Sequence, residues 1–157
     1  MDIKILNYAL LGALAIALLF CVYSDIRFRK IYNKITLPIA LAAPLYWYAT
    51  NTLGWQDVGP HIATGAAIFI FFAICNHFGF MGGGDVKLFA VLALWFPWTD
   101  MAALLIYASL LGAVVTVVFA VSHRVRKQKG KIQIPYGVAI AISGLILAGE
   151  PFFNHFG

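Results

Sequence analysis

Charged side chains are scarce in this sequence, and their scarcity excludes a soluble globular protein. Only 11% of the 157 residues are charged and 62% are hydrophobic, with a mean hydropathy of +0.89. A water-soluble domain of this length could not bury that much apolar surface, so the composition indicates a polytopic membrane protein. Because no long polar stretch separates the apolar runs, we expect one transmembrane domain over residues 1–157.

Cysteine is also scarce, and no cluster of metal ligands is visible. Cys21 and Cys75 are single residues within apolar runs, which excludes a zinc ribbon or a disulfide framework. No HExxH or similar ligand spacing occurs, so we expect neither a metal nor another cofactor. The net charge of +5 could suggest a nucleic-acid partner. The basic residues, however, lie in short loops between apolar runs, so we expect no such partner.

Six apolar runs are candidates for membrane-spanning helices, each of which needs roughly 20 residues. Prolines mark several of their ends: Pro60 precedes the third run, Pro97 is late in the fourth, and Pro135 opens the sixth. The predicted fold class is therefore all-α, with about six transmembrane helices at residues 5–24, 35–50, 60–78, 86–98, 100–122 and 135–149.

The basic residues predict the orientation of these helices. With both termini outside, ten of the eleven basic residues lie on the cytoplasmic side, as the positive-inside rule requires, and only Lys4 does not. The ten are Arg27, Arg29, Lys30, Lys34, Lys87, Arg124, Arg126, Lys127, Lys129 and Lys131. The four tryptophans, Trp47, Trp55, Trp95 and Trp98, all fall near the opposite boundary, where an interfacial aromatic belt is expected.

Two carboxylates share the cytoplasmic end in this topology. Asp25 closes the first helix and Asp85 opens the fourth, whereas the other four acids, Asp2, Asp57, Asp100 and Glu150, map to the outer side. The 13 residues from Asp85 to Trp98 rise only about 20 Å, so Asp85 is expected below the inner surface of a bilayer about 30 Å thick. We also expect non-helical backbone at Gly82, Gly83 and Gly84, facing a hydrated pocket. The alternative is a glycine turn that Asp85 simply caps.

Two neighbouring carboxylates suit the hydrolysis of a peptide bond. They cannot both ionise easily, so one keeps its proton near neutral pH. The ionised member can take a proton from water while the protonated member hydrogen-bonds the peptide carbonyl. Asp85 opens a helix and Asp25 closes one, so the helix dipoles favour Asp85 as the base and Asp25 as the acid. The glycines would admit an extended substrate strand.

Three segments resemble one protease family. GGGDVKL (Gly82 to Leu88) fits the GxGD signature of intramembrane aspartic proteases. SDIRFRKIYN (Ser24 to Asn33) resembles the other aspartate segment of type IV prepilin peptidases, and IPYGVAIA (Ile134 to Ala141) resembles the start of that family's last helix. The resemblance covers essentially the whole chain. The short length of the sequence resembles that of the minimal prepilin peptidases associated with Flp (tight-adherence) pili.

The resemblance implies a function, a substrate and a site. The protein would be an aspartic endopeptidase of the cytoplasmic membrane, with Asp25 and Asp85 catalytic on the cytoplasmic side. Its substrates would be prepilins with a short basic leader and an apolar helix, held beside anionic lipid headgroups. The residues expected to bind the substrate are Gly82, Gly83, Gly84, Lys87, Pro135, Tyr136 and Gly137. Lys87 could equally steer the charge of Asp85 or extend to the surface, and Tyr136 could equally be an interfacial anchor.

Two departures from the family pattern limit what the resemblance implies. The CxxC-containing N-terminal domain of the large prepilin peptidases has no counterpart in the sequence, so we expect no zinc or methyltransferase domain. Tyr32 stands where the family has a proline, which leaves the shape of the first inner loop open. The alternative function is a proton-coupled transporter or a non-proteolytic pilus-assembly subunit, because paired carboxylates also form proton relays.

Overall fold

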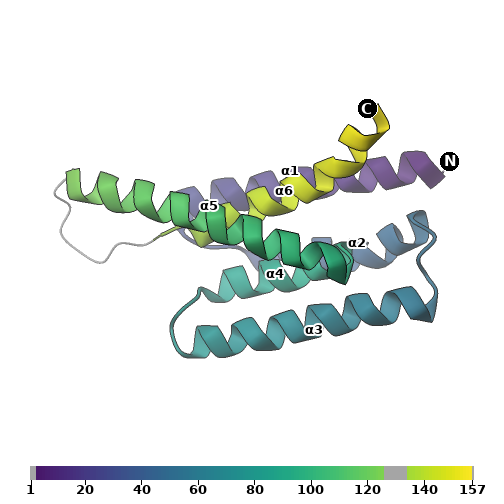
Figure 1. Cartoon of the computed structure of the whole chain (residues 1–157), viewed down its shortest axis with the longest axis horizontal. Helices are drawn as coiled ribbons and strands as arrows, with labels where there is room; N and C mark the ends of the chain where they lie inside the picture. Colours follow the sequence, from purple (N-terminus) through teal and green to yellow (C-terminus); the bar gives the residue numbers. More distant parts are fainter. Residues whose placement is uncertain (1–2, 126–133, 157) are drawn as a thin grey trace.

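A computed structural model describes residues 3–125 and 134–156, with side chains of the last helix described as far as Pro151. Every regular element in this part of the chain is a helix, which confirms the predicted all-α fold class. The six helices are α1 (Ile3–Phe28), α2 (Asn33–Ala49), α3 (Trp55–His77), α4 (Gly83–Trp95), α5 (Trp98–Val125) and α6 (Tyr136–Phe156). They lie roughly side by side in an elongated bundle, and α1 begins where α6 ends, as the predicted topology requires (Figure 1).

The bundle is organised around α4 and α6. Helix α4 packs against α2, α3 and α6, and α6 packs in turn against α1 and α5. Most side chains of α4 and of the first half of α6 are buried, and the contact between α1, α4 and α6 is close. A Cβ atom on Gly144 of α6 would lie 3.1 Å from both Leu18 and Leu92. Both central helices begin at the same end of the bundle (Figure 1).

Three of the helices, α1, α3 and α5, are long and apolar enough to cross a membrane by length and composition, and α6 has a shorter apolar stretch. Helix α4 has only 13 residues, so it is about 20 Å long against a hydrocarbon thickness of about 30 Å. Its neighbours shield it from the surroundings, which explains how so short a helix can lie inside a membrane bundle.

The tryptophans depart from the predicted belt. Trp55 and Trp98 are exposed, but Trp47 and Trp95 are buried, so the belt prediction is wrong for these two. Their indole N–H groups form a reciprocal pair of bonds between α2 and α4. Trp47 Nε1 donates to the carbonyl of Leu94 at 2.8 Å, and Trp95 Nε1 donates to that of Ile39 at 2.9 Å. A buried indole that finds such an acceptor is stable away from the interface.

Replacing Trp47 with Phe should lower the free energy of unfolding by about 1–3 kcal/mol, because the Leu94 carbonyl near the end of α4 would lose its donor. The matched control is Trp55→Phe, since Trp55 is 81% exposed. Denaturation of both variants in detergent micelles measures the difference. Equal midpoints for the two variants would contradict a structural role for the bond from Trp47.

Candidate active site

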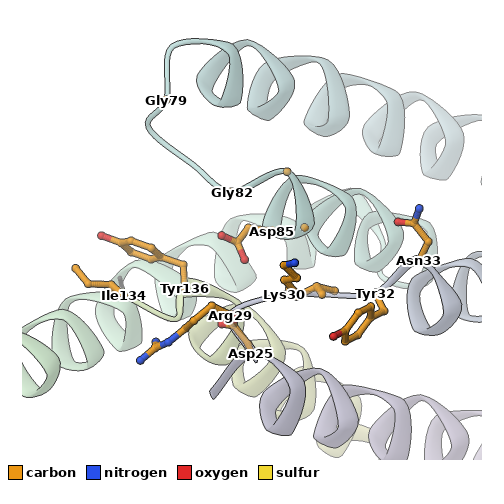
Figure 2. A pocket seen from close by; sticks show the side chains of 13 residues that line it. Asp25, Arg29, Lys30, Tyr32, Asn33, Gly79, Gly82, Asp85, Ile134 and Tyr136 are labelled. Carbon is orange, nitrogen blue, oxygen red and sulfur yellow. The ribbon is translucent and has the colours of Figure 1, made fainter. Parts of the chain in front are cut away.

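Asp25 and Asp85 line one cavity of about 770 Å³ at the end of the bundle where α4 and α6 begin. The two carboxyl groups come from α1 and α4, 60 positions apart in the sequence, and lie on facing sides of the cavity (Figure 2). Both side chains are almost fully enclosed, with 6% of Asp25 and 9% of Asp85 exposed. The predicted convergence of the two acids is present in the structure.

Asp25 lies in the last turn of α1 and is held by the start of α6. The backbone N–H of Val138 donates to Asp25 Oδ2 at 3.2 Å. This contact depends on Gly137, because a Cβ atom there would lie 2.9 Å from the same oxygen and 2.6 Å from Ile31 Cδ1. The carboxyl group therefore rests directly on the first turn of α6, where any side chain larger than that of glycine would force Asp25 and Ile31 to shift.

Asp85 lies in the first turn of α4, three residues after the N-cap Gly82. Its side chain folds back over the cap, since a Cβ atom on Gly82 would lie 3.0 Å from Asp85 Oδ2. Position 84, which also lines the cavity, needs a small residue as well, because a Cβ atom on Gly84 would lie 3.0 Å from Ile31 Cβ. Ile31 thus packs against Gly84 on one side and Gly137 on the other, and so lies between the start of α4, which carries Asp85, and the start of α6, which contacts Asp25.

The triple glycine is less irregular than expected. The prediction of non-helical backbone at all three positions is wrong for Gly83 and Gly84, because α4 begins at Gly83. The left-handed residue of this connection is Gly79, with φ of 79°. Asn76 closes the turn by donating from Nδ2 to the carbonyl of Met81 at 2.6 Å. The three glycines therefore allow close packing and leave the cavity open to a substrate, and only Gly82 lies outside the helix.

The segment between α1 and α2 lines much of the cavity, which the sequence did not predict. Arg29, Lys30, Ile31, Tyr32 and Asn33 all contribute to its wall, together with Gly79 and Ile134. Arg29, the first residue after α1, is in the left-handed region with φ of 54°, and its N–H donates to the carbonyl of Asp25 at 3.0 Å. Ser24 Oγ fixes the turn by donating to the carbonyl of Lys30 at 2.6 Å. The sequence did not predict the shape of this loop, because Tyr32 stands where the family that the sequence resembles has a proline.

The guanidinium of Arg29 turns away from Asp85 (Figure 2). It lies over the ring of Phe119 on α5, 4.6 Å from the ring centroid, in a cation–π contact. Arg29 therefore connects the end of α1 to α5 and brings a positive charge to the wall of the cavity. The predicted basic cluster also included Arg126, Lys127, Lys129 and Lys131, which lie outside the described residues.

The residues predicted to bind substrate divide into two groups. Gly82, Gly83, Gly84 and Tyr136 line the cavity, whereas Lys87, Pro135 and Gly137 do not. Pro135 is fully buried, and Gly137 acts through the close contact with Asp25 described above. Lys87 Nζ donates to Asn33 Oδ1 at 2.9 Å and so joins the start of α2 to the start of α4.

The helix ends do not distinguish the acid from the base. Asp25 lies at the C-terminal end of α1, which disfavours its charge, but its carboxyl group also meets the N-terminus of α6. Asp85 meets the N-terminus of α4. Since both carboxyl groups face a helix N-terminus, the difference on which the assignment rested is absent.

The arrangement has the parts needed for water activation by two carboxyl groups. The cavity is large enough for water and a strand of peptide, and its wall contains backbone and charged groups as well as apolar ones. Within the described part of the chain, no three His, Cys, Asp or Glu side chains gather in a cluster that could hold a metal ion. The chemistry open to these side chains is acid–base chemistry on a bound water.

Comparisons with known proteins identify relatives of this chain. The model of the type IV leader peptidase family matches residues 12–117, a segment that contains both aspartates. A protein of Bacillus subtilis named prepilin leader peptidase/N-methyltransferase is 34% identical over 142 residues, 83% of this chain and 51% of the relative. Proteins of the same name from Aeromonas salmonicida and Stutzerimonas stutzeri are each 30% identical, over 86% and 70% of this chain and 48% and 40% of the relatives. The chain thus spans about half the length of these relatives, and no solved structure matches it.

Proposed function

The chain belongs to the type IV leader peptidase family, and on this premise we propose that it is a membrane-embedded aspartic endopeptidase that removes the basic leader from prepilins. The observation that carries the proposal is the placement of Asp25 and Asp85 on facing sides of one cavity. Relatives named prepilin leader peptidase support the substrate class. The finer assignment to Flp-like prepilins rests on the sequence resemblance.

In the proposed mechanism the two aspartates share one proton and hold a water molecule between them. The ionised carboxylate takes a proton from the water as it adds to the scissile carbonyl, and the protonated carboxyl group hydrogen-bonds the developing oxyanion. The tetrahedral adduct then collapses as the C–N bond breaks, and the carboxyl group that received the water proton donates it to the leaving amine. No covalent intermediate with the enzyme forms. Either aspartate can begin as the base, because the proton belongs to the pair.

The substrate backbone must be extended where it is cut, because the peptide bonds of a helix are shielded by their own hydrogen bonds. One part of the cavity wall has no side chains, because it consists of Gly82, Gly83 and Gly84. Another part of the wall is formed by Tyr136. A strand passing between them would lie beside both carboxyl groups. We therefore assign these four residues to substrate contact, and Lys87, Pro135 and Gly137 to positioning the walls.

We place the cavity at the cytoplasmic face of the inner membrane. Arg27, Arg29, Lys30, Lys34 and Lys87 all lie at the cavity end of the bundle, which the positive-inside rule assigns to the cytoplasm. Two acidic residues, Asp57 and Asp100, lie in the first turns of α3 and α5, and both helices begin at the opposite end of the bundle (Figure 1). Anionic headgroups around the basic side chains would hold both the enzyme and the basic leader at this surface.

Cleavage in a defined membrane tests the proposal. The protein is reconstituted in vesicles that contain anionic phospholipid and mixed with Flp-like and other type IV prepilins. We expect a shortened product whose new N-terminus, read by mass spectrometry, follows the basic leader. A folded protein that leaves every prepilin of this panel intact would contradict the proposed function.

A further inference from the structure

A second hollow, of about 520 Å³, lies next to the catalytic cavity. Its walls come from α3, α4, α5 and α6, with Phe72 and Phe89 on one side and α5 on the other. Tyr136 lines both hollows and therefore stands at their junction. Met81, one residue before the glycine wall of the cavity, also lines the second hollow. We call this second hollow the α3–α5 groove.

The α3–α5 groove is apolar, whereas the catalytic cavity is mixed. Among the residues that the structure describes, none with a charged side chain lines the groove. The two hydroxyl groups that α5 contributes are satisfied within that helix, since Ser109 Oγ donates to the carbonyl of Leu105 at 2.7 Å and Thr116 Oγ1 donates to that of Gly112 at 2.6 Å. Helices α3 and α5 make little contact with each other, so the groove opens between them at the outside of the bundle.

We propose that the α3–α5 groove binds the apolar helix that follows the scissile bond of the substrate. The inference rests on the proposed peptidase function and identifies where that substrate is held. A peptide that leaves the catalytic cavity toward the membrane must satisfy its own backbone N–H and C=O groups, because lipid offers no partners. It must therefore become helical there, and the groove that continues from the cavity past Tyr136 is where that helix begins.

The dimensions of the groove fit one face of a helix. Its volume is in the range of about 300–1,000 Å³ that is usual for ligand sites, which holds several side chains but not a whole helix of about 10 Å diameter. On the α5 side the small residues Ala108, Ser109 and Ala113 line the wall, and small residues allow helices in membranes to approach closely. On the opposite side, Phe72 and Phe89 stack with ring centroids 4.6 Å apart and form a flat wall.

A bulky side chain in the groove should weaken binding of the substrate helix without changing the chemical step, so it tests the two separately. Ala113 lines the groove, whereas its neighbour Val114 is 59% exposed and does not. Ala113→Trp should lower kcat/KM for a full-length prepilin about tenfold or more, mainly through KM, as expected when a central interface contact is blocked. It should leave within about twofold the cleavage of a short peptide that carries the leader and the scissile bond but no apolar helix. Val114→Trp should change neither rate.

These outcomes distinguish the groove from the proposed function. Wild-type protein that cuts neither substrate would contradict the peptidase function itself. An equal loss on both substrates in Ala113→Trp, or equal losses in the two tryptophan variants, would overturn the groove while leaving the peptidase function in place.

Photo-crosslinking identifies the occupant directly. Benzoylphenylalanine is placed at Val117, which lines the groove, or at Val118, which is exposed to the outside of α5, in a protein carrying Asp85→Asn to retain uncut prepilin. We expect an adduct between position 117 and the apolar segment of the prepilin, and none from position 118. Adducts to lipid alone at position 117 would overturn the proposal, because they would show that acyl chains fill the groove.

Discussion

Replacing either Asp25 or Asp85 with Asn should lower the rate of prepilin cleavage at least about 10³-fold, the effect expected when a general acid or base is lost. Asparagine keeps the size of each side chain and can still accept from the Val138 N–H that holds Asp25. It can neither share a proton with its partner nor take one from water. The initial rate of product formation in vesicles, measured at enzyme concentrations high enough to detect slow turnover, gives the effect for each variant.

Two controls separate lost chemistry from lost structure. Asp57→Asn removes an exposed carboxyl group from the opposite end of the bundle and should leave the rate unchanged. The Asp25 and Asp85 variants should also keep the helical content and thermal midpoint of the parent in detergent, since buried neutral groups replace buried carboxyl groups. Normal cleavage by either variant would rule out the two-aspartate mechanism, and a loss confined to one of them would point to a single base.

Much of the fold followed from local features of the sequence. Long apolar runs with prolines at their ends predict helices in a membrane, and the basic residues predict which ends lie together. That topology alone brought Asp25 and Asp85 to one end, and the structure places them in one cavity. The helix boundaries differed most at α6, which ends at Phe156 and not at the predicted residue 149. Helices α1, α3 and α5 also extend beyond the apolar runs, because polar residues continue a helix outside the hydrocarbon.

The details of the site depended on contacts between distant segments, which a single sequence does not encode locally. The bond from the α6 N-terminus to Asp25 joins residues 113 apart, and the bond from Lys87 to Asn33 joins residues 54 apart. The burial of Trp47 and Trp95 likewise needed the pairing of α2 with α4. The signal that could have identified the first of these contacts was Gly137 itself, since a glycine in the first turn of a helix indicates that another group approaches closely.

Gly137→Ala should lower the cleavage rate about 10²-fold while the protein stays folded. The added Cβ would lie 2.9 Å from Asp25 Oδ2, so the carboxyl group must move, and a shift of about 1 Å in a catalytic group can cost this much. The matched control is Gly12→Ala, because Gly12 lies inside α1 with nothing within 4 Å of the added atom. That change should raise the free energy of unfolding by about 0.5–1 kcal/mol and leave the rate unchanged.

A second substitution distinguishes displacement of the Asp25 carboxyl group from a general loss of stability in Gly137→Ala. The Cβ at position 137 would also lie 2.6 Å from Ile31 Cδ1, a methyl group that Ile31→Val removes. The double variant should therefore recover the thermal midpoint lost in Gly137→Ala but not the cleavage rate, because the contact with Asp25 persists. Recovery of both quantities together would show that packing around Ile31, and not the position of the carboxyl group, is what Gly137 protects. Gly137 would then contribute only to the stability of the bundle, and the position of Asp25 would depend on its bond to Val138 alone.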